Sequence, residues 1–250
     1  MAPEKMPEAN LAEESPSKKI AVITGGSRGI GLAIAKKFAE AKYDVIILGR
    51  EAARLKSAID QLNVRHLLAE SKVCDVRLPG SVEAAFQQIA AEHTRIDVLV
   101  NNAGVAHALA PAQKLSLDIW KKVIDTNLTG MFLVTQAALP LMRSGSTIVN
   151  NLSVAAIQPF AGMSAYNASK YGAYGFTQAL REDLRKAGIR VVALMPGATD
   201  TEIWGQFWPD APRGKMVSPQ AVAEAVLHAV SAPANASIDE IRLGPASGVL

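Results

Sequence analysis

A tyrosine and a lysine stand four residues apart in the stretch SAYNASKYG, residues 164–172. Residues with this spacing lie on the same face of an α-helix, about 6 Å apart along its axis. A free tyrosine has a pKa of about 10 and is a poor base at neutral pH, but a neighbouring cation lowers that pKa. We therefore expect Lys170 to lower the pKa of Tyr166, so that the phenol can donate a proton to a carbonyl or accept one from an alcohol.

A serine precedes this pair at the point where an apolar run ends. Ser153 closes the run STIVNNLS, residues 146–153, and stands thirteen residues before Tyr166. In parallel sheets covered by helices, ligands bind at the carboxyl ends of the strands. A hydroxyl in that place would donate a hydrogen bond to the oxygen of a substrate. Two plainer interpretations remain: Ser153 is a loop residue, and Tyr166 and Lys170 lie on a solvated helix face.

The stretch TGGSRGIG, residues 24–31, follows the first apolar run and opens the first helical pattern. Gly25, Gly29 and Gly31 would let backbone N–H groups approach a phosphate, and the helix N-terminus adds partial positive charge. Strand, glycines and helix occur in the order that dinucleotide binding requires. The sequence therefore favours nucleotide binding over a turn in which glycine serves a steric purpose alone.

The end of the second apolar run indicates which dinucleotide would bind. NAD sites of this type commonly place a carboxylate there for the ribose 2′-hydroxyl. Here the position is Gly49, followed by Arg50, and Arg28 stands in the glycine turn. Guanidinium groups suit phosphate through bidentate, charge-assisted hydrogen bonds. The sequence therefore predicts NADP(H), although both arginines would also fit a solvated surface.

Alternating apolar and amphipathic segments must position these residues. Such alternation predicts parallel strands joined by right-handed crossovers, and continuous apolar runs predict strands buried on both faces. We expect strands at 19–26, 43–50, 71–76, 96–104, 146–153, 189–197 and 238–244, and helices at 30–41, 50–62, 80–93, 116–143 (two helices meeting near Asn127), 164–187 and 219–231. One doubly wound α/β domain, residues 19–250, is the simplest interpretation. Two lobes would need a linker near residue 145, where the turn RSGS is short.

The composition argues against several classes of function. The chain has 250 residues, 49% of them hydrophobic, and a net charge of +3 without a basic run, so nucleic-acid binding is not expected. A single cysteine, Cys74, and four scattered histidines predict a cytoplasmic protein without disulfide or metal site. No apolar run is long enough for a membrane span. Residues 1–18 are polar and contain proline, which predicts a flexible tail rather than a signal peptide.

Together these motifs resemble the short-chain dehydrogenase/reductase family. The matching residues are TGGSRGIG (24–31), NNAG (101–104), Asn127 in DTNLTG, Ser153, YNASK (166–170) and PGATDT (196–201). They occur in the family's order over roughly residues 18–244. The resemblance implies a Rossmann-like domain with a seven-stranded parallel sheet and nicotinamide-dependent interconversion of carbonyls and alcohols. The pattern looks most like that of 3-oxoacyl-carrier-protein reductases and NADPH carbonyl reductases.

The resemblance also implies roles for individual residues. Tyr166 is the general acid/base, Lys170 binds the nicotinamide ribose and tunes the tyrosine, and Ser153 orients the substrate carbonyl. Asn127 holds a water that relays protons through Lys170. The cofactor-binding set implied by the resemblance is Gly25, Ser27, Arg28, Gly29, Ile30, Gly31, Arg50, Asp75, Val76, Asn102, Ala103, Gly104, Tyr166, Lys170, Pro196, Gly197, Thr199 and Thr201. Within it, Asp75 would meet the adenine amino group.

The segment at 196–218 concentrates aromatic side chains. Ile203, Trp204 and Phe207 would cover the nicotinamide, and Gln158, Phe160 and Met163 would form the opposite side. This suits an apolar or aromatic ketone, or an acyl chain. The resemblance further implies a homo-oligomer, a dimer or tetramer, formed by the helix that carries Tyr166 and the long helix before Ser153. Apolar surface for this contact would come from Tyr171, Tyr174, Phe176 and Leu180.

Three hypotheses about function remain. The first is NADPH-dependent reduction of a ketone, an aldehyde or a 3-oxoacyl thioester. The second is an NAD-linked alcohol or sugar dehydrogenase of the same fold, against which Gly49 and Arg50 argue. The third is a non-catalytic NADP(H)-binding regulatory protein, against which the complete set of Asn127, Ser153, Tyr166 and Lys170 argues.

Overall fold

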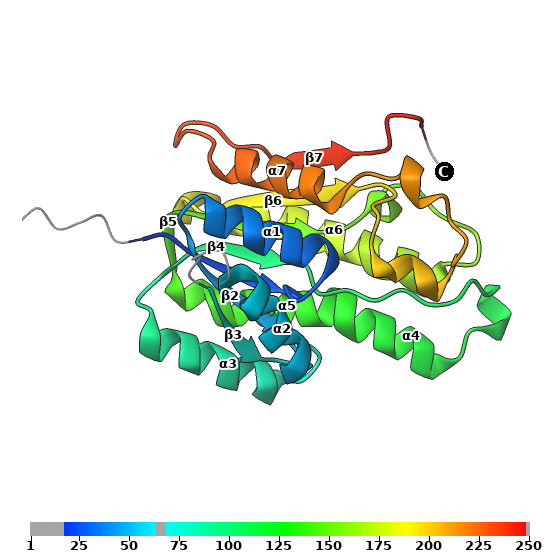
Figure 1. The fold of residues 1–250 in the computed structure, drawn as a ribbon, viewed down its shortest axis with the longest axis horizontal. Helices are drawn as coiled ribbons and strands as arrows, with labels where there is room; N and C mark the ends of the chain where they lie inside the picture. The colour runs from blue at the N-terminus through cyan, green and yellow to red at the C-terminus, as the bar shows by residue number, and fades with distance from the viewer. Residues whose placement is uncertain (1–17, 64–68, 249–250) are drawn as a thin grey trace, which may run out of the picture.

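A sheet of parallel strands forms the centre of the molecule (Figure 1). The computed structural model describes residues 18–63 and 69–248. Within them, seven strands follow the order β3-β2-β1-β4-β5-β6-β7, and all neighbouring pairs are parallel. The strands are β1 (Ile20–Thr24), β2 (Asp44–Gly49), β3 (Ala69–Val73), β4 (Ile96–Asn101), β5 (Met142–Asn151), β6 (Arg190–Pro196) and β7 (Glu240–Leu243). The order reverses between β1 and β4, which is where such sheets open a crevice at the carboxyl ends of their strands.

Helices cover both faces of this sheet (Figure 1). Side chains of α1, α2 and α7 pack against one face, and those of α3, α5 and α6 pack against the other. The helices are α1 (Gly29–Glu40), α2 (Ala52–Asn63), α3 (Pro79–Glu92), α4 (Leu117–Ile124), α5 (Gly130–Ala138), α6 (Ser164–Leu184) and α7 (Pro219–Val230). The doubly wound, Rossmann-like α/β fold expected from the sequence is therefore confirmed.

Burial on both faces explains the strand sequences. Along β1, Val22 packs toward α3 and α5, whereas Ile23 packs toward α1 and α7, and both are fully buried. Neither face of a central strand selects polar residues, so the strand is a continuous apolar run. β3 lies at the edge of the sheet and contains no fully buried residue. The strand begins at Ala69, and its first residues include the polar Glu70, so the apolar pattern predicted a start two residues later, at 71.

The helical pattern at 116–143 contains a widened turn. α4 leads into a π-helical turn, Asp125–Thr129, and then into α5. The expected boundary near Asn127 is therefore a π turn within one helical run rather than a gap between two helices. Such turns are frequent at functional sites. A 3-10 segment, Leu139–Leu141, ends the run, and β5 begins at Met142, so the expected helix end at 143 was too late.

α6 matches its expected range closely. The helix covers Ser164–Leu184, and a 3-10 turn extends it to Ala187. Gly188 then adopts a φ of 72°, the left-handed conformation that ends many helices. Among the described residues, no helix is both long and apolar enough to cross a membrane. The expected tail, residues 1–18, lies outside the described residues except for Lys18.

Candidate active site

The carboxyl ends of the central strands open into one large cavity of about 690 Å³. Its lining comes from the glycine turn after β1, the ends of β2 and β4, the turn after β5, the start of α6 and the segment after β6. The expected catalytic and cofactor-binding residues all line this cavity except Gly31 and Asn127. The fold thus brings together residues that are spread over most of the chain.

The turn between β1 and α1 has a shape that favours glycine. Gly25 and Gly29 have φ angles of 63° and 52°, which residues with a side chain rarely adopt. A Cβ on Gly31 would lie 2.3 Å from the carbonyl oxygen of Gly25. Gly31 therefore serves the close approach of α1 to the turn rather than the cavity surface. The N-terminus of α1 provides free N–H groups and partial positive charge, which suit an anion.

An asparagine after β4 holds this turn in place. Nδ2 of Asn102 donates hydrogen bonds to the carbonyl oxygens of Thr24 (3.0 Å) and Gly25 (3.2 Å). Oδ1 of Asn102 accepts a hydrogen bond from Nδ2 of Asn151 at 2.8 Å. The Thr24 hydroxyl accepts from the N–H groups of Asn102 and Ala103. Sequence reasoning missed Thr24 and Asn151; the only signal was a polar residue at the end of an apolar run.

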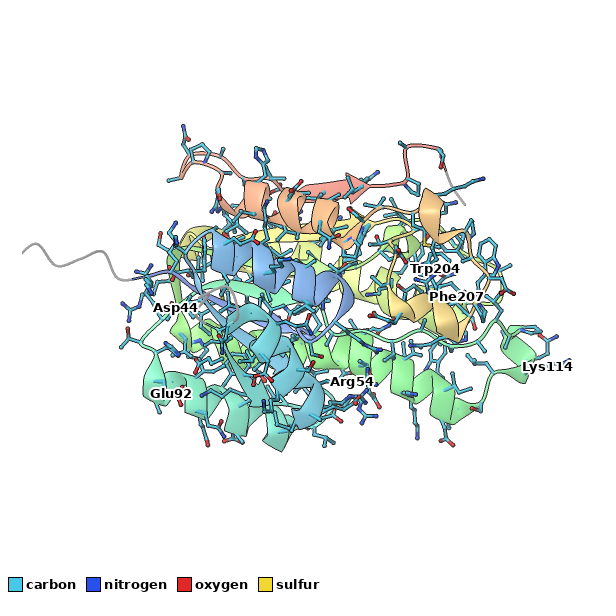
Figure 2. The ribbon with its side chains drawn as sticks, viewed as in Figure 1. Asp44, Arg54, Glu92, Lys114, Trp204 and Phe207 are labelled. Carbon is cyan, nitrogen blue, oxygen red and sulfur yellow. The ribbon has the colours of Figure 1, made fainter. Side chains whose placement is uncertain are left out.

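Basic side chains gather where β2 ends. Arg28, Arg50 and Arg54 line the cavity there, and Figure 2 marks Arg54 on α2. Nε and Nη2 of Arg77 donate to the Asp75 carboxylate at 2.9 and 2.6 Å. This ion pair holds the pKa of Asp75 below its usual value. Asp75 lines the cavity as expected, but Arg77 already uses part of its capacity to accept hydrogen bonds.

Ser153 has an unusual backbone conformation. Its φ angle is 146°, and residues with side chains adopt such values at a cost of about 1–3 kcal/mol. The Ser153 hydroxyl accepts a hydrogen bond from the N–H of Ala155 at 3.1 Å and caps a short 3-10 segment, Val154–Ala156. Strain of this kind persists only where the surrounding structure fixes it. Here it accompanies a serine that lines the cavity directly after β5.

Tyr166 lies in the first turn of α6, next to Ser153. Burial raises the pKa of the Tyr166 phenol, and a hydrogen bond with the Ser153 hydroxyl partly opposes this rise. The expectation that Lys170 lowers this pKa is wrong for the chain by itself. Burial destabilises the phenolate more than the hydrogen bond with Ser153 stabilises it. The phenol is therefore protonated at neutral pH and is ready to act as an acid.

Lys170 is buried one helical turn further along α6. Its Nζ lies 5.6 Å from the centroid of the Tyr166 ring and donates a hydrogen bond to the carbonyl oxygen of Asn151 at 3.0 Å. Burial lowers the pKa of Lys170 to about 8. The ammonium group is therefore still mostly charged at neutral pH, and the end of β5 fixes its position.

Asn127 lies behind the cavity, in the π turn. Its Nδ2 donates hydrogen bonds to the carbonyl oxygen of Val105 (2.9 Å) and to the hydroxyl of Ser169 (3.0 Å). Its Oδ1 accepts from the N–H of Val105 at 2.8 Å. Both amide N–H groups are thus used within the protein. A water between Asn127 and Lys170 would have to bind an oxygen of Asn127, of the side chain or of the main chain.

The β6–α7 segment, residues 197–218, forms one side of the cavity. Nε1 of Trp204 donates a hydrogen bond to the carbonyl oxygen of Thr199 at 2.8 Å. The ring centroids of Trp204 and Phe207 lie 4.8 Å apart, and Figure 2 shows the two residues together. The expected aromatic cover is therefore a packed cluster. Sequence reasoning missed Glu202: its Oε2 lies 3.6 Å from where a Cβ of Gly29 would be, beside the glycine turn.

The shape and charge of this cavity fit a dinucleotide. One end offers a glycine turn, a helix N-terminus and three arginines; the other end offers Ser153, Tyr166 and Lys170. A phosphate in the glycine turn would meet the Glu202 carboxylate, which must then move aside. Fold and site together define a class of protein, the Rossmann-like oxidoreductases that use a nicotinamide dinucleotide.

Comparison with known proteins specifies the family. The model of the short chain dehydrogenase family matches residues 19–212. The chain belongs to this family. The motifs of the glycine turn and of α6 predicted a short-chain dehydrogenase/reductase, and this prediction is confirmed. The prediction of an oxidoreductase is confirmed with it.

Relatives with assigned activities cover nearly the whole chain. A sulfoacetaldehyde reductase of Chromohalobacter salexigens is 35% identical over 237 residues, which are 90% of this chain and 94% of the relative. An NADP-dependent 3-hydroxy acid dehydrogenase of Salmonella typhi is 34% identical over 240 residues, with the same coverage of both chains. Among solved structures, a serine dehydrogenase in its closed form with NADP⁺ has a TM-score of 0.84 and 31% identity, covering 92% of this chain and 96% of its own.

Proposed function

We propose that this protein is an NADPH-dependent carbonyl reductase that converts a ketone or an aldehyde into an alcohol. The observation that carries the proposal is the meeting of Ser153, Tyr166 and Lys170 in the same cavity as the glycine turn and Arg50. A proton donor and a dinucleotide cradle in one cavity can serve the same carbonyl. Bound NADPH supplies the hydride to the carbonyl carbon.

The protein's own part in the reaction is to place and protonate the carbonyl. Tyr166 donates its phenolic proton to the carbonyl oxygen as negative charge develops there. Its raised pKa keeps that proton in place until substrate arrives. The Ser153 hydroxyl donates a second hydrogen bond to the same oxygen and fixes the orientation of the substrate. In the reverse direction the same groups accept a proton from an alcohol.

Lys170 acts beside the phenol rather than on the substrate. Its Nζ lies 5.6 Å from the centroid of the Tyr166 ring, so its role in this proposal is to hold the cofactor beside the phenol. Its hydrogen bond to the carbonyl oxygen of Asn151 leaves further N–H groups for the ribose of the cofactor. Asn127 supports this arrangement by joining Val105 to Ser169, next to Lys170 in α6.

The cofactor is NADP(H) rather than NAD(H). Arg28 and Arg50 line the cavity at the end of β2, where a ribose 2′-phosphate would lie, and no carboxylate follows Gly49 directly. Relatives support this choice: the Salmonella typhi dehydrogenase is NADP-dependent by name, and an actinorhodin polyketide ketoreductase with NADPH has a TM-score of 0.81 and 30% identity.

The proposal also includes the catalytic domain, the cellular compartment and the oligomeric state. In this proposal residues 19–250 are the catalytic domain. The protein acts in the cytoplasm as a homo-oligomer, a dimer or tetramer, on small molecules. Exposed Trp120 on α4, Phe132 on α5 and Tyr171 on α6 support an assembly through these helices. Cys74 is a buried free thiol, which supports a reducing compartment.

The test follows NADPH absorbance with a panel of aldehydes, ketones and 3-oxoacyl thioesters. Tyr166→Phe removes the proton donor, so we expect kcat to fall by about 10²–10⁴-fold while NADPH still binds. Tyr171→Phe is the matched control, because it removes the same hydroxyl from an exposed tyrosine of the same helix that does not line the cavity. Unchanged turnover of Tyr166→Phe would contradict the assigned role.

A further inference from the structure

The end of the cavity beyond Tyr166 is lined mainly by carbon. Phe160 and Met163 line it from the segment before α6, and Trp204, Phe207 and Trp208 line it from the β6–α7 segment. Besides Ser153, the polar side chains in these two segments that line the cavity are Gln158 and Gln206, together with Thr199, Thr201 and Glu202. We call the five carbon-rich residues the apolar end of the cavity.

Positive charge lies at the other end. Arg28, Arg50 and Arg54 line the cavity near the glycine turn and β2, where Glu51 also lines it and pairs with Arg54 at 2.7 Å. Figure 2 shows Arg54 well apart from Trp204 and Phe207. Among the described lining residues from the segments that form the apolar end, none is basic. Arg213 belongs to the β6–α7 segment, but its Nη1 donates to Oδ1 of Asp200 at 2.6 Å, and it does not line the cavity.

The charge that the β6–α7 segment does bring to the cavity is negative. Glu202 is its one ionisable lining residue among those described. The Glu202 carboxylate itself lies beside Gly29, at the end of the cavity with the glycine turn. A carboxylate or sulfonate on the substrate would therefore leave water at the apolar end without gaining a cationic partner there. Burying an unpaired charge in this way is strongly unfavourable. Lys170 does not change this balance, because its ammonium group is held by Asn151 beside the reacting centre.

The apolar end also has a defined shape. Trp204 is anchored by its hydrogen bond to Thr199, and the centroids of its ring and of Trp208 lie 6.1 Å apart at an interplanar angle of 61°. Ordered aromatic faces and edges favour a flat apolar group in offset or edge-to-face contact. A site that is formed before the ligand arrives costs less ordering on binding.

We propose that the substrate is an uncharged carbonyl compound with an apolar, preferably aromatic, group, and that anionic carbonyl compounds are rejected. This inference rests on the proposed function and adds the substrate class. It separates this chain from two of its relatives, whose names specify a sulfonated aldehyde and hydroxy acids as substrates.

The experiment compares two substrates that share one ketone. The methyl ester of para-acetylbenzoic acid and the free acid differ in charge but hardly in shape. We expect kcat/KM with NADPH to be at least about 100-fold higher for the ester, mostly through KM. Equal values for the two, or a preference for the acid, would overturn the inference while leaving the reductase in place. Absence of NADPH oxidation with both, and with the whole carbonyl panel, would overturn the proposed function and this inference with it.

A variant tests whether the missing cation is the cause. Gln158→Arg places a guanidinium at an exposed position that lines the cavity near Phe160. We expect the ratio of kcat/KM for the acid over that for the ester to rise at least about tenfold. Gln113→Arg is the matched control, since Gln113 is exposed and does not line the cavity. The same ratio in both variants and in the unchanged chain would contradict the charge argument.

Discussion

At the scale of single residues, the site depends on what burial does to ionisable groups. The same burial raises the pKa of the Tyr166 phenol and lowers that of the Lys170 ammonium to about 8. Both shifts favour the neutral form, because a charge loses more than a neutral group when it leaves water. At neutral pH the phenol is therefore protonated, and the ammonium group is still charged although its pKa is close to the ambient pH.

Arg50 is the residue whose change would test the choice of cofactor. Arg50→Asp replaces attraction for a 2′-phosphate by repulsion. We expect the Kd for NADPH to rise by about 10- to 100-fold, the worth of a charge-assisted contact, and the Kd for NADH to change little. Fluorescence titration with each cofactor measures both values.

A control separates local contact from overall charge in this experiment. Lys56→Asp changes the net charge of the protein by the same amount as Arg50→Asp. Lys56 is an exposed residue of α2 that pairs with Asp60 and does not line the cavity. This variant should bind NADPH nearly as the unchanged chain does. Equal losses of NADPH affinity in Lys56→Asp and Arg50→Asp would mean that Arg50 makes no specific contact.

At the scale of elements, side chains from neighbouring strands fix the loops that carry the site. Asn102 after β4 binds the glycine turn, and Asn151 at the end of β5 binds both Asn102 and Lys170. Deeper in the sheet, Asn101 of β4 donates to Asn150 of β5 at 2.9 Å. These bonds tie the carboxyl ends of β1, β4 and β5 to α6. Cofactor cradle and proton donor are therefore parts of one connected frame.

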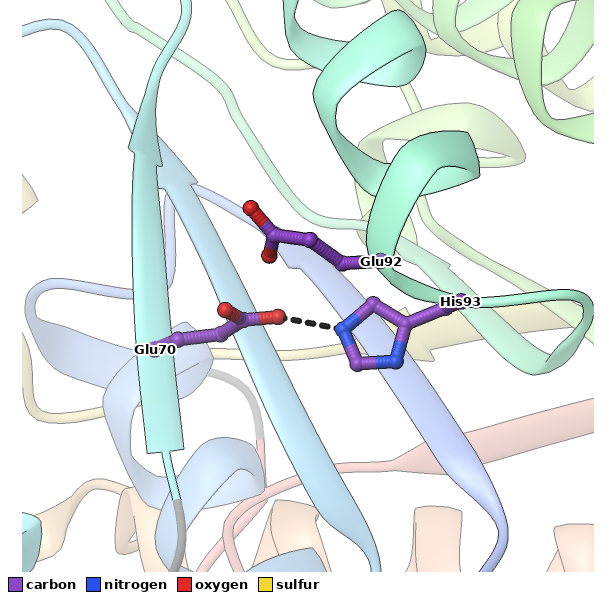
Figure 3. Close-up of side chains that lie close together, drawn as sticks. All are labelled: Glu70, Glu92 and His93. Atoms are coloured by element: carbon purple, nitrogen blue, oxygen red, sulfur yellow. Dashed lines mark hydrogen bonds and ion pairs between the residues drawn. The ribbon is translucent and has the colours of Figure 1, made fainter.

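An ion-pair network joins the edge strand β3 to the end of α3 (Figure 3). Nε2 of His93 lies 2.6 Å from Oε1 of Glu70, and Glu92 projects toward the same place. Nζ of Lys72 lies 2.6 Å from Oε2 of Glu92 and 3.5 Å from Oε2 of Glu70. The Lys72 ammonium group thus forms ion pairs with both carboxylates, those of Glu70 and Glu92. We therefore interpret the cluster as a clasp between β3 and α3.

The clasp makes stability depend on pH in a definite direction. Lys72 lowers the pKa of Glu92 and has its own pKa raised. The Glu92 contribution is present above its unfolded pKa and is lost as pH falls through the lower, folded value. The Lys72 contribution is present below its unfolded pKa and is lost only as pH rises through its raised, folded value. The unchanged chain should thus lose this contribution in acid, near and below the ordinary pKa of a glutamate.

Lys72→Met tests this prediction. The variant should unfold at a lower temperature than the unchanged chain at pH 7, and the difference should shrink as pH falls below about 4. Thermal unfolding followed by circular dichroism at both pH values measures it. Lys56→Met serves as a control, because its ion pair with Asp60 lies within one exposed helix and contributes little. A difference in Tm that stays constant with pH would contradict the clasp.

At the scale of the whole molecule, one apolar surface remains unexplained by the single chain. Trp120, Phe132 and Tyr171 are 39%, 44% and 44% exposed, on α4, α5 and α6. Of the residues expected to form this surface, Leu180 is buried in the core, and the hydroxyl of Tyr174 donates to Glu240. Burial of such a surface between copies of the chain would remove its apolar area from water.

Phe132→Glu tests the assembly. A carboxylate at this position would be buried in the contact without a partner, so we expect the assembly to dissociate to monomers at micromolar concentration. Light scattering coupled to gel filtration measures the mass. Leu78→Glu is the control, because Leu78 is also exposed but precedes α3, a helix that carries none of these three residues. A monomer in the unchanged chain, or equal masses for all three proteins, would refute the homo-oligomer.

The sequence by itself determined the order of strands and helices, the glycine turn and the identities of Ser153, Tyr166 and Lys170. These follow from local periodicity and from residue types at fixed spacing, which neighbouring residues along the chain decide. The sequence could not show the direction of the Tyr166 pKa shift, because that shift depends on which distant segments remove the phenol from water.

Only the tertiary structure decided which residues meet from far apart in the chain. Asn151 binds both Asn102 and Lys170, Glu202 lies beside Gly29, and Phe160 and Trp204 line the same cavity. No local pattern encodes these contacts, since each results from crossovers that bring the carboxyl ends of parallel strands to one edge of the sheet. Residue types at fixed spacing therefore predicted a proton donor and a dinucleotide turn, whereas the charge balance around them depends on the packing of the folded chain.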